Sequence, residues 1–174
     1  MMAPGPRRLI VLRHAKSAWP DVDDHERPLG PRGLRDAPAA GRWLRDNDCV
    51  PDLAICSTAR RTRETWDLVA AELGATPPAV FDERVYEASA AALLDVVRQA
   101  PDRPRTLLLV GHQPGVQQLV LTVAGEADGD ALVRAGEKFP TSATAVLALP
   151  GTWADLAPGA AVLTDFAVPR GRKG

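Results

Sequence analysis

One stretch near the N-terminus, Leu9-Ile10-Val11-Leu12-Arg13-His14, decides the fold class of this chain. Its first four residues are all apolar, and such an unbroken run is typical of a strand that is buried on both faces of a parallel sheet. Two further apolar runs, at residues 53–56 and 106–110, predict two more strands of the same kind. These three runs therefore predict the centre of an α/β sheet.

The segments between these strands have helical periodicity, with apolar residues recurring every three to four positions. Four helices are predicted, at residues 33–46, 58–73, 90–99 and 113–123. A closing pair of strands is predicted at residues 143–149 and 161–168, and loops at residues 20–31, 125–130 and 136–140. This alternation predicts a three-layer α/β/α sandwich with a mainly parallel central sheet.

Length and charge limit the domain count and the kind of partner. The 174 residues are enough for one domain with a buried core, which we place at residues 8–168, with flexible ends at 1–7 and 169–174. The 21 basic and 22 acidic side chains give a formal net charge of −1. This balance argues against nucleic acid or an anionic membrane surface as the main partner. No stretch approaches the roughly 20 apolar residues that span a bilayer.

Cysteine and acidic residues give no sign of a metal site. Cys49 and Cys56 are too few for a disulfide framework or a four-ligand zinc site, so the expected compartment is the reducing cytoplasm. The acidic cluster at residues 21–26 lacks the glycine and the terminal glutamate of a calcium-binding loop, and we expect it to form a solvated rim. We therefore expect neither a metal nor another cofactor.

Polar residues that suit phosphate chemistry follow all three predicted central strands. The first strand leads directly into Arg13 and His14. The second leads into Ser57 and a helix that carries three arginines, and the third leads into His112. Ligands bind at the carboxyl ends of strands in open α/β sheets. Guanidinium groups and imidazoles that converge there suit a phosphoryl group, with an imidazole as the nucleophile.

Each of these signals also has a simpler interpretation. An Arg-His pair after a strand is most often a polar strand end, and His112 could be a core histidine with both nitrogens satisfied. Arginines in the first turns of a helix are usually a solvated face, although they oppose the helix dipole unless an anion lies nearby. The occurrence of all three signals in this order is much less expected by chance.

With these residues in view, the sequence resembles the histidine phosphatase superfamily (phosphoglycerate mutase-like), and within it the short SixA-like phosphohistidine phosphatases. The likeness spans almost the whole chain. It is carried by residues 12–17, 27–33, 57–65, 110–114 and 141–143.

The resemblance implies a role for each matching residue. His14 would be the nucleophile that becomes phosphorylated, and Arg13 would bind the phosphate. Counting four residues from Ser57, as in the family's Ser-x-x-x-Arg pattern, identifies Arg61 as the second phosphate arginine. His112 would be the second family histidine, which binds a phosphoryl oxygen.

Two serines complete the implied site. Ser17 stands where many relatives have a threonine after the Arg-His motif, and Ser142 would help to line the pocket. Two nearby guanidinium groups should lower the pKa of His14, because they repel its imidazolium form. His112 would serve best as a cation, because a bound phosphate raises its pKa. Catalysis is then mostly positioning and electrostatic stabilisation.

The leaving group separates two substrate classes. An alkyl phosphoester leaves as a poor alkoxide and needs a general acid, whereas the imidazole of phosphohistidine leaves easily once protonated. The resemblance implies that larger members of the superfamily supply a carboxylic acid and that SixA-like members generally do not. Glu87 lies roughly where that acid would fall, and the simpler interpretation is a solvated loop glutamate. We therefore favour a protein phosphohistidine phosphatase over a small-molecule phosphomonoesterase or mutase that uses Glu87.

The expected partners follow from this choice. The short separation of Gly33 from Arg61 leaves little room for a lid, so we expect a shallow site that is open to a phosphorylated protein. A phosphotransfer domain or a phosphocarrier protein would suit it, with a small phosphoester as the alternative. Inorganic phosphate is the expected product, and the short chain suggests a monomer. A non-catalytic phosphate-binding module is disfavoured because both histidines and both arginines are present.

Overall fold

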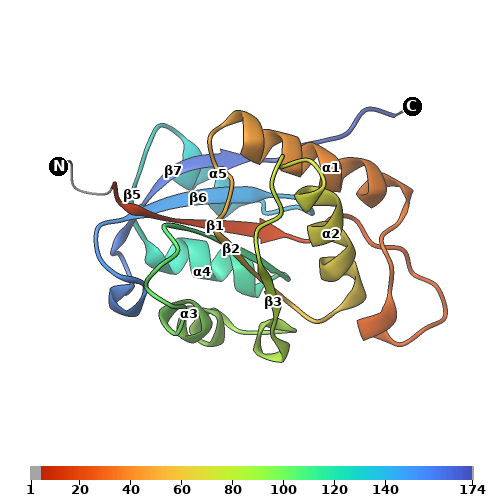
Figure 1. Cartoon of the computed structure of the whole chain (residues 1–174), viewed down its shortest axis with the longest axis horizontal. Helices are drawn as coiled ribbons and strands as arrows, with labels where there is room; N and C mark the ends of the chain where they lie inside the picture. Colours follow the sequence, from red (N-terminus) through yellow and green to blue (C-terminus); the bar gives the residue numbers. More distant parts are fainter. Residues whose placement is uncertain (1–4, 174) are drawn as a thin grey trace.

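A seven-stranded sheet forms the middle of the protein in the computed structural model, which describes residues 5–173 (Figure 1). The strands are β1 (Arg7–Arg13), β2 (Leu53–Cys56), β3 (Ala79–Phe81), β4 (Thr106–Gly111), β5 (Ala124–Ala127), β6 (Thr144–Leu149) and β7 (Ala161–Ala167). The α-helices are α1 (Pro31–Asp46), α2 (Arg60–Ala70), α3 (Ala90–Arg98), α4 (Gly115–Val123) and α5 (Ala131–Glu137). Short 3₁₀ helices lie at Asp24–Glu26, Glu83–Val85 and Trp153–Asp155.

The order of the strands is β3-β2-β4-β1-β6-β7-β5, so the first predicted strand lies in the centre. β1 pairs in parallel with β4, and β4 pairs in parallel with β2. β6 runs antiparallel to its neighbours β1 and β7. The predicted sandwich with a mainly parallel sheet is therefore confirmed, with β6 as the reversed strand. The parallel arrangement brings the carboxyl ends of β1, β2 and β4 to one edge of the molecule.

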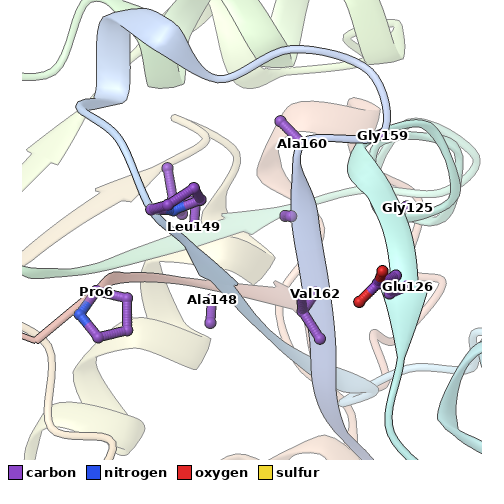
Figure 2. A pocket seen from close by; sticks show the side chains of 10 residues that line it. Pro6, Gly125, Glu126, Ala148, Leu149, Gly159, Ala160 and Val162 are labelled. Atoms are coloured by element: carbon purple, nitrogen blue, oxygen red, sulfur yellow. The ribbon is translucent and has the colours of Figure 1, made fainter.

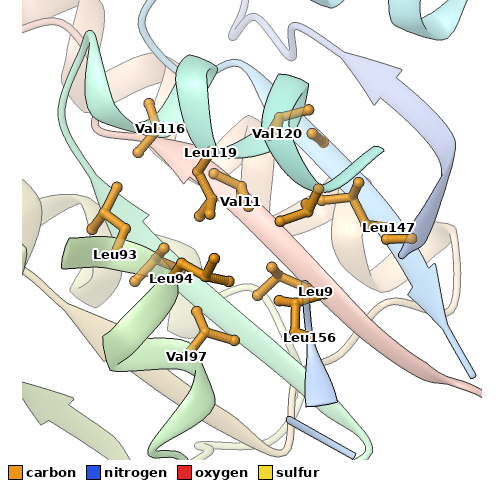
Figure 3. Close-up of a cluster of buried hydrophobic side chains, with 14 of the residues drawn as sticks. Leu9, Val11, Leu93, Leu94, Val97, Val116, Leu119, Val120, Leu147 and Leu156 are labelled. Atoms are coloured by element: carbon orange, nitrogen blue, oxygen red, sulfur yellow. The ribbon is translucent and has the colours of Figure 1, made fainter. Parts of the chain in front are cut away.

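The alternation of side chains along β1 explains the three layers. Leu9 and Val11 pack on one face of the sheet with residues of α3 and α4 (Figure 3). Ile10 and Leu12 pack on the other face with residues of α1 and α2. All four side chains are fully buried. A continuous apolar run is required because helices cover both faces of this strand.

The loop between β1 and α1 is folded back on itself. Ser17 pairs with Leu29 in an isolated antiparallel bridge, and the Ala18 N–H donates to Pro28 O at 2.9 Å. Gly33, in the first turn of α1, closes the base of this loop. A Cβ at that position would lie 2.1 Å from Lys16 O, so only glycine permits this approach of the helix to the residues after His14.

The structure differs from the predicted elements at three short segments. β5 occupies part of the predicted loop 125–130, and neither β3 nor α5 was predicted. β3 has three residues and β5 has the sequence Ala-Gly-Glu-Ala, both at the edges of the sheet. Edge strands of this kind are formed by pairing with a neighbour and carry no periodic apolar pattern of their own. These differences do not affect the edge of the sheet where β1, β2 and β4 end.

Residues near both ends of the described chain contact the rest of the fold. Residues 1–4 and 174 lie outside the described part, while Arg7 already belongs to β1. Near the other end, Arg170 Nη1 lies 3.2 Å from Asp36 Oδ2, and the Gly171 N–H donates to Asp36 Oδ1 at 2.9 Å. The Asp36 carboxylate is almost fully buried in α1, and it needs these partners. Residues 170 and 171 are therefore attached to α1 by hydrogen bonds.

Candidate active site

Hydrogen bonds between loops bring the three predicted strand ends together. The His14 N–H donates to Gly111 O at 3.1 Å, which places His14 beside the end of β4. The Ser57 N–H donates to Val110 O at 3.1 Å, which adds the end of β2. The rings of His14 and His112 have centroids 5.3 Å apart. The structure thus gathers the predicted residues of all three strands at one place.

The hydrogen bond of His14 determines which of its ring nitrogens can react. Nδ1 lies 2.7 Å from Ala15 O, and a carbonyl oxygen can only accept, so Nδ1 carries the ring proton. Nε2 then presents a lone pair. The pKa of His14 is lowered to about 3, mainly by burial and to a smaller extent by His112, Arg61 and Arg13, against the opposing effect of the hydrogen bond to the Ala15 carbonyl. The ring is therefore neutral at pH 7, as a nucleophile requires.

His112 is held by Ser57, whose position in the sequence indicates only where Arg61 lies. His112 Nε2 lies 2.7 Å from Ser57 Oγ, which also accepts the Ala59 N–H at 3.1 Å. Its Nδ1 is buried and has no hydrogen-bond partner among residues 5–173. Burial lowers the pKa of His112 to about 3, with Arg61 the next cause. His112 is therefore neutral at pH 7, and the cationic form expected from the sequence would require the negative charge of a bound phosphate.

Arg13 and Arg61 approach the histidines from different elements. Arg13, at the end of β1, donates from Nη1 to Phe139 O at 3.1 Å, and its Nε is buried without a partner among residues 5–173. Burial lowers the pKa of this guanidinium. Arg61, in the first turn of α2, is buried and donates to Asp24 O at 2.8 Å and to Asp24 Oδ2 at 3.2 Å. Both arginines therefore hold fixed positions beside the rings.

Asp24 belongs to the site although no residue pattern indicates it. Its side chain is 43% exposed, as expected for the solvated rim, and its carboxylate also accepts from Arg61, from Arg27 and from the hydroxyl of Tyr86. The Tyr86 bond, followed by the two arginines, holds the pKa of Asp24 well below its usual range. Burial and the bond to Asp24 raise the pKa of Tyr86 to about 12. An ionised carboxylate and a neutral phenol therefore belong to the site.

Tyr86 also contacts the second histidine directly. Its ring meets the ring of His112 edge-on, with centroids 5.5 Å apart and an interplanar angle of 80°. No residue pattern indicates Asp24 or Tyr86, because their contact joins the loop at residues 20–31 to the segment after β3. Only the tertiary structure brings these two segments together.

The three remaining candidates occupy different positions. The Ser17 hydroxyl accepts from Arg27, so it supports the loop after β1. Ser142 has φ of 65°, and its N–H donates to Arg13 O at 3.1 Å and to His14 O at 3.2 Å, so its backbone holds the segment that contains Arg13 and His14. Its buried Oγ has no partner within the described chain. Glu87 is exposed, directly after Tyr86, with φ of 53°.

A separate hollow of about 480 Å³ lies at the opposite end of β1, where Pro6 and Leu149 line it (Figure 2). β1 separates it from His14 by roughly 20 Å. Its single charged lining residue is Glu126. It therefore lacks the cations that a phosphoryl group requires.

Among residues 5–173, no helix is long and apolar enough to cross a membrane.

The two neutral histidines predict that acid weakens the fold. With folded pKa values of about 3 against an ordinary 6.5, the unfolded chain binds protons first, so stability falls as the pH drops from about 6.5 toward 3. Lowering the pH from 7.5 to 5.5 should cost about 1.4 kcal/mol for each histidine. Urea unfolding at the two pH values measures this loss. The double variant His14→Gln, His112→Asn should lose less stability between the two pH values than the wild type. If its stability depended on pH as strongly as that of the wild type, the two histidines would not be the groups whose pKa values are lowered in the fold.

Known proteins resemble this chain in sequence and in structure. The family model of the histidine phosphatase superfamily (branch 1) matches residues 9–100. An uncharacterized protein of Mycobacterium tuberculosis is 46% identical over 162 residues, which cover 91% of this chain and 100% of that protein. An uncharacterized protein of Mycobacterium leprae is 38% identical over 165 residues, which cover 91% and 100%.

Two solved structures of proposed SixA phosphohistidine phosphatases resemble the whole chain. The protein of Nakamurella multipartitia has a TM-score of 0.79 and 32% identity, over 95% of this chain and 98% of that one. The protein of Agrobacterium tumefaciens has a TM-score of 0.77 and 29% identity, over 94% and 99%. The matching family model, these folds and the paired histidines agree. The chain therefore belongs to the histidine phosphatase superfamily and is SixA-like within it.

Proposed function

We propose that this chain is a phosphohistidine phosphatase that acts on proteins, with His14 as its nucleophile. The observation that carries the proposal is the neutral His14 ring, whose proton is held on Nδ1 by Ala15 O while its Nε2 is left with a lone pair. Two guanidinium groups and a second imidazole lie beside it. The free cysteines Cys49 and Cys56 support a reducing, cytoplasmic location.

In the first step, Nε2 of His14 forms a bond to phosphorus while the bond from phosphorus to the substrate imidazole breaks. Arg13 and Arg61 balance the charge of the phosphoryl oxygens, and Nδ1 of His112 is available to one of them. The Nδ1 proton of His14 stays in place, so the intermediate is a phosphorylated imidazolium. The Ala15 carbonyl oxygen, 2.7 Å from Nδ1, stabilises its positive charge.

In the second step, a water oxygen attacks phosphorus and the bond to His14 breaks. His14 leaves as a neutral imidazole that still carries its Nδ1 proton, and the proton of the water passes to phosphate or solvent. Inorganic phosphate is the product. No proton needs to be transferred to or from His14, which agrees with the low pKa of its ring.

The carboxylates near the site favour an imidazole leaving group. Asp24 is kept ionised by three donors, so it has no proton to give to an alkoxide. Glu87 is exposed to solvent beside Tyr86. A phosphohistidine whose ring is already protonated on the other nitrogen needs no such acid, because its imidazole departs as a neutral ring. The alternative, a small-molecule phosphomonoesterase or mutase, depends on Glu87 acting as the acid.

One comparison tests these two functions. We would measure kcat/KM for a histidine-phosphorylated peptide and for p-nitrophenyl phosphate, and for an alkyl phosphate as the ester that needs an acid. The wild type and Glu87→Gln should both prefer the phosphohistidine peptide and differ by less than about twofold. Glu83→Gln, an exposed glutamate four residues earlier, is the matched control. A selective loss of alkyl phosphate activity in Glu87→Gln, with that ester as the better substrate, would favour the alternative.

A further inference from the structure

An exposed tryptophan lies in the loop that follows the catalytic histidine. Trp19 is 76% exposed, while the other large apolar side chain that is most accessible in the described chain, Val133, is 63% exposed. A single exposed apolar side chain is common on protein surfaces and carries no meaning alone. The surroundings of Trp19 distinguish it, because they hold the ring in place beside the site.

Arg27 fixes the indole ring of Trp19. Its guanidinium carbon lies 3.3 Å from the ring centroid, which is close stacking. Arg27 is itself buried, with Nε donating to Ala18 O at 3.1 Å, Nη1 to Asp24 Oδ1 at 3.0 Å and Nη2 to the Ser17 hydroxyl. One side of the indole is therefore occupied by a rigid group. Binding of a partner to the exposed side of the indole would therefore cost little conformational entropy, because the ring is already held in place.

The same contacts connect Trp19 to the phosphate-binding residues. Asp24 bonds through Oδ1 to Arg27 and through Oδ2 to Arg61. Trp19 is thus joined to Arg61 through two side chains. A small phosphoester has few atoms beyond its phosphoryl group with which to contact the indole. A phosphohistidine on a protein brings neighbouring side chains, and these can reach it.

The residues next to Trp19 indicate the chemistry of that neighbouring segment. Val22 is 49% exposed and lies between Asp21 and Asp23, which are both exposed. Within residues 5–173, neither of these aspartates forms an ion pair. An aromatic and an aliphatic side chain flanked by two free carboxylates complement an apolar side chain that is accompanied by a cation.

We propose that Trp19 and Val22, with Asp21 and Asp23, form a docking surface for the protein substrate. It receives a segment that carries an apolar and a basic side chain next to its phosphohistidine. This inference rests on the proposed function, because only a phosphorylated protein presents such a segment. It assigns substrate selection to the loop between β1 and α1, and leaves the chemistry to His14 and the arginines.

Two synthetic phosphohistidine peptides of equal length test the docking surface. One carries leucine and lysine beside the phosphohistidine, and the other carries serine and glutamate at the same positions. The wild type should prefer the first. Trp19→Ala should lower its kcat/KM for the first peptide about tenfold, mainly through KM, which is the size of effect typical of an exposed aromatic anchor. Hydrolysis of p-nitrophenyl phosphate should change by less than about twofold.

Matched variants separate docking from loop structure. Val133→Ala, an exposed apolar residue on the opposite side of the sheet, should leave both substrates unchanged. Trp19→Phe should restore most of the affinity, because it keeps an aromatic ring on Arg27. Asp21→Asn with Asp23→Asn should reduce the preference for the lysine peptide, and added salt should do the same in the wild type.

The outcomes also separate this inference from the proposed function. If the wild type hydrolyses p-nitrophenyl phosphate but neither peptide, the proposed function fails and the docking surface fails with it. If the wild type hydrolyses the peptides but Trp19→Ala changes nothing, only the docking surface is wrong. An equal loss on peptide and p-nitrophenyl phosphate would mean that Trp19 supports the loop, and that result would also overturn the inference.

Discussion

Replacing His14 with alanine is expected to lower kcat by about a thousandfold or more and to abolish the phosphorylated enzyme. The reason is that, in the proposed mechanism, Nε2 of His14 accepts the phosphoryl group, and an alanine side chain offers no nucleophile in its place. Rapid acid-free quenching of the wild type with a radiolabelled phosphohistidine peptide should trap label on the protein. The variant should carry none.

His25→Ala is the matched control for this experiment. His25 is another histidine near the site, where its Nε2 lies 2.9 Å from Thr58 Oγ1 and its ring meets Tyr86 edge-on. Its loss should leave the trapped label on the protein. If His14→Ala kept its activity while His25→Ala lost it, the nucleophile would have been assigned wrongly. If the wild type bound phosphate but formed no intermediate, the chain would be a binding module.

Replacing Arg61 with alanine is expected to lower kcat/KM by about 10²-fold to 10³-fold, whichever phosphorylated substrate is used. Arg61 is a buried cation whose fork is already fixed by the backbone carbonyl and the carboxylate of Asp24. Removing it takes away a preorganised partner of the phosphoryl oxygens. Arg61→Lys should recover only part of the loss, because an ammonium group keeps the charge but lacks the planar fork.

The neighbouring arginine of the same helix turn provides the control. Arg60 is exposed and pairs with Glu64 at 3.0 Å, and its replacement with alanine should change kcat/KM by less than about twofold. Circular dichroism should show that both variants fold, because Arg61→Ala leaves Asp24 with Arg27 and Tyr86 as partners. Equal losses of kcat/KM in the two variants would mean that activity depends on the total positive charge of α2 and not on the position of Arg61.

The centre of the fold could be predicted from the sequence because it depends on local patterns. The apolar run at residues 9–12 has one stable location, between two helical layers, and the helices follow from their own periodicity. β3, β5 and α5 could not be predicted, since they are short and depend on a neighbour for their pairing or packing. Short edge elements have too few residues to show a period.

The residues of the site also fall into those that local patterns indicate and those that depend on long-range contacts. Arg13, His14 and His112 follow central strands directly, so the strand prediction also predicts where they meet. Arg61 required the spacing from Ser57. Asp24 and Tyr86 belong to segments with no regular pattern, and their role depends on contacts across the loop. The tautomer of His14 depends on the orientation of one carbonyl, which no residue pattern encodes.

The direction of β1 determines how the protein is best attached to a solid support. The strand begins at Arg7 beside the hollow of Figure 2 and ends at Arg13, next to His14, so Pro6 lies at the end of the sheet that is far from the site. The other end of the chain is held on α1, and Arg170 also donates to Thr141 O at 2.8 Å, next to Ser142. Immobilisation through the N-terminal side should leave the site open, whereas traction on the tail would be transmitted to the backbone behind His14.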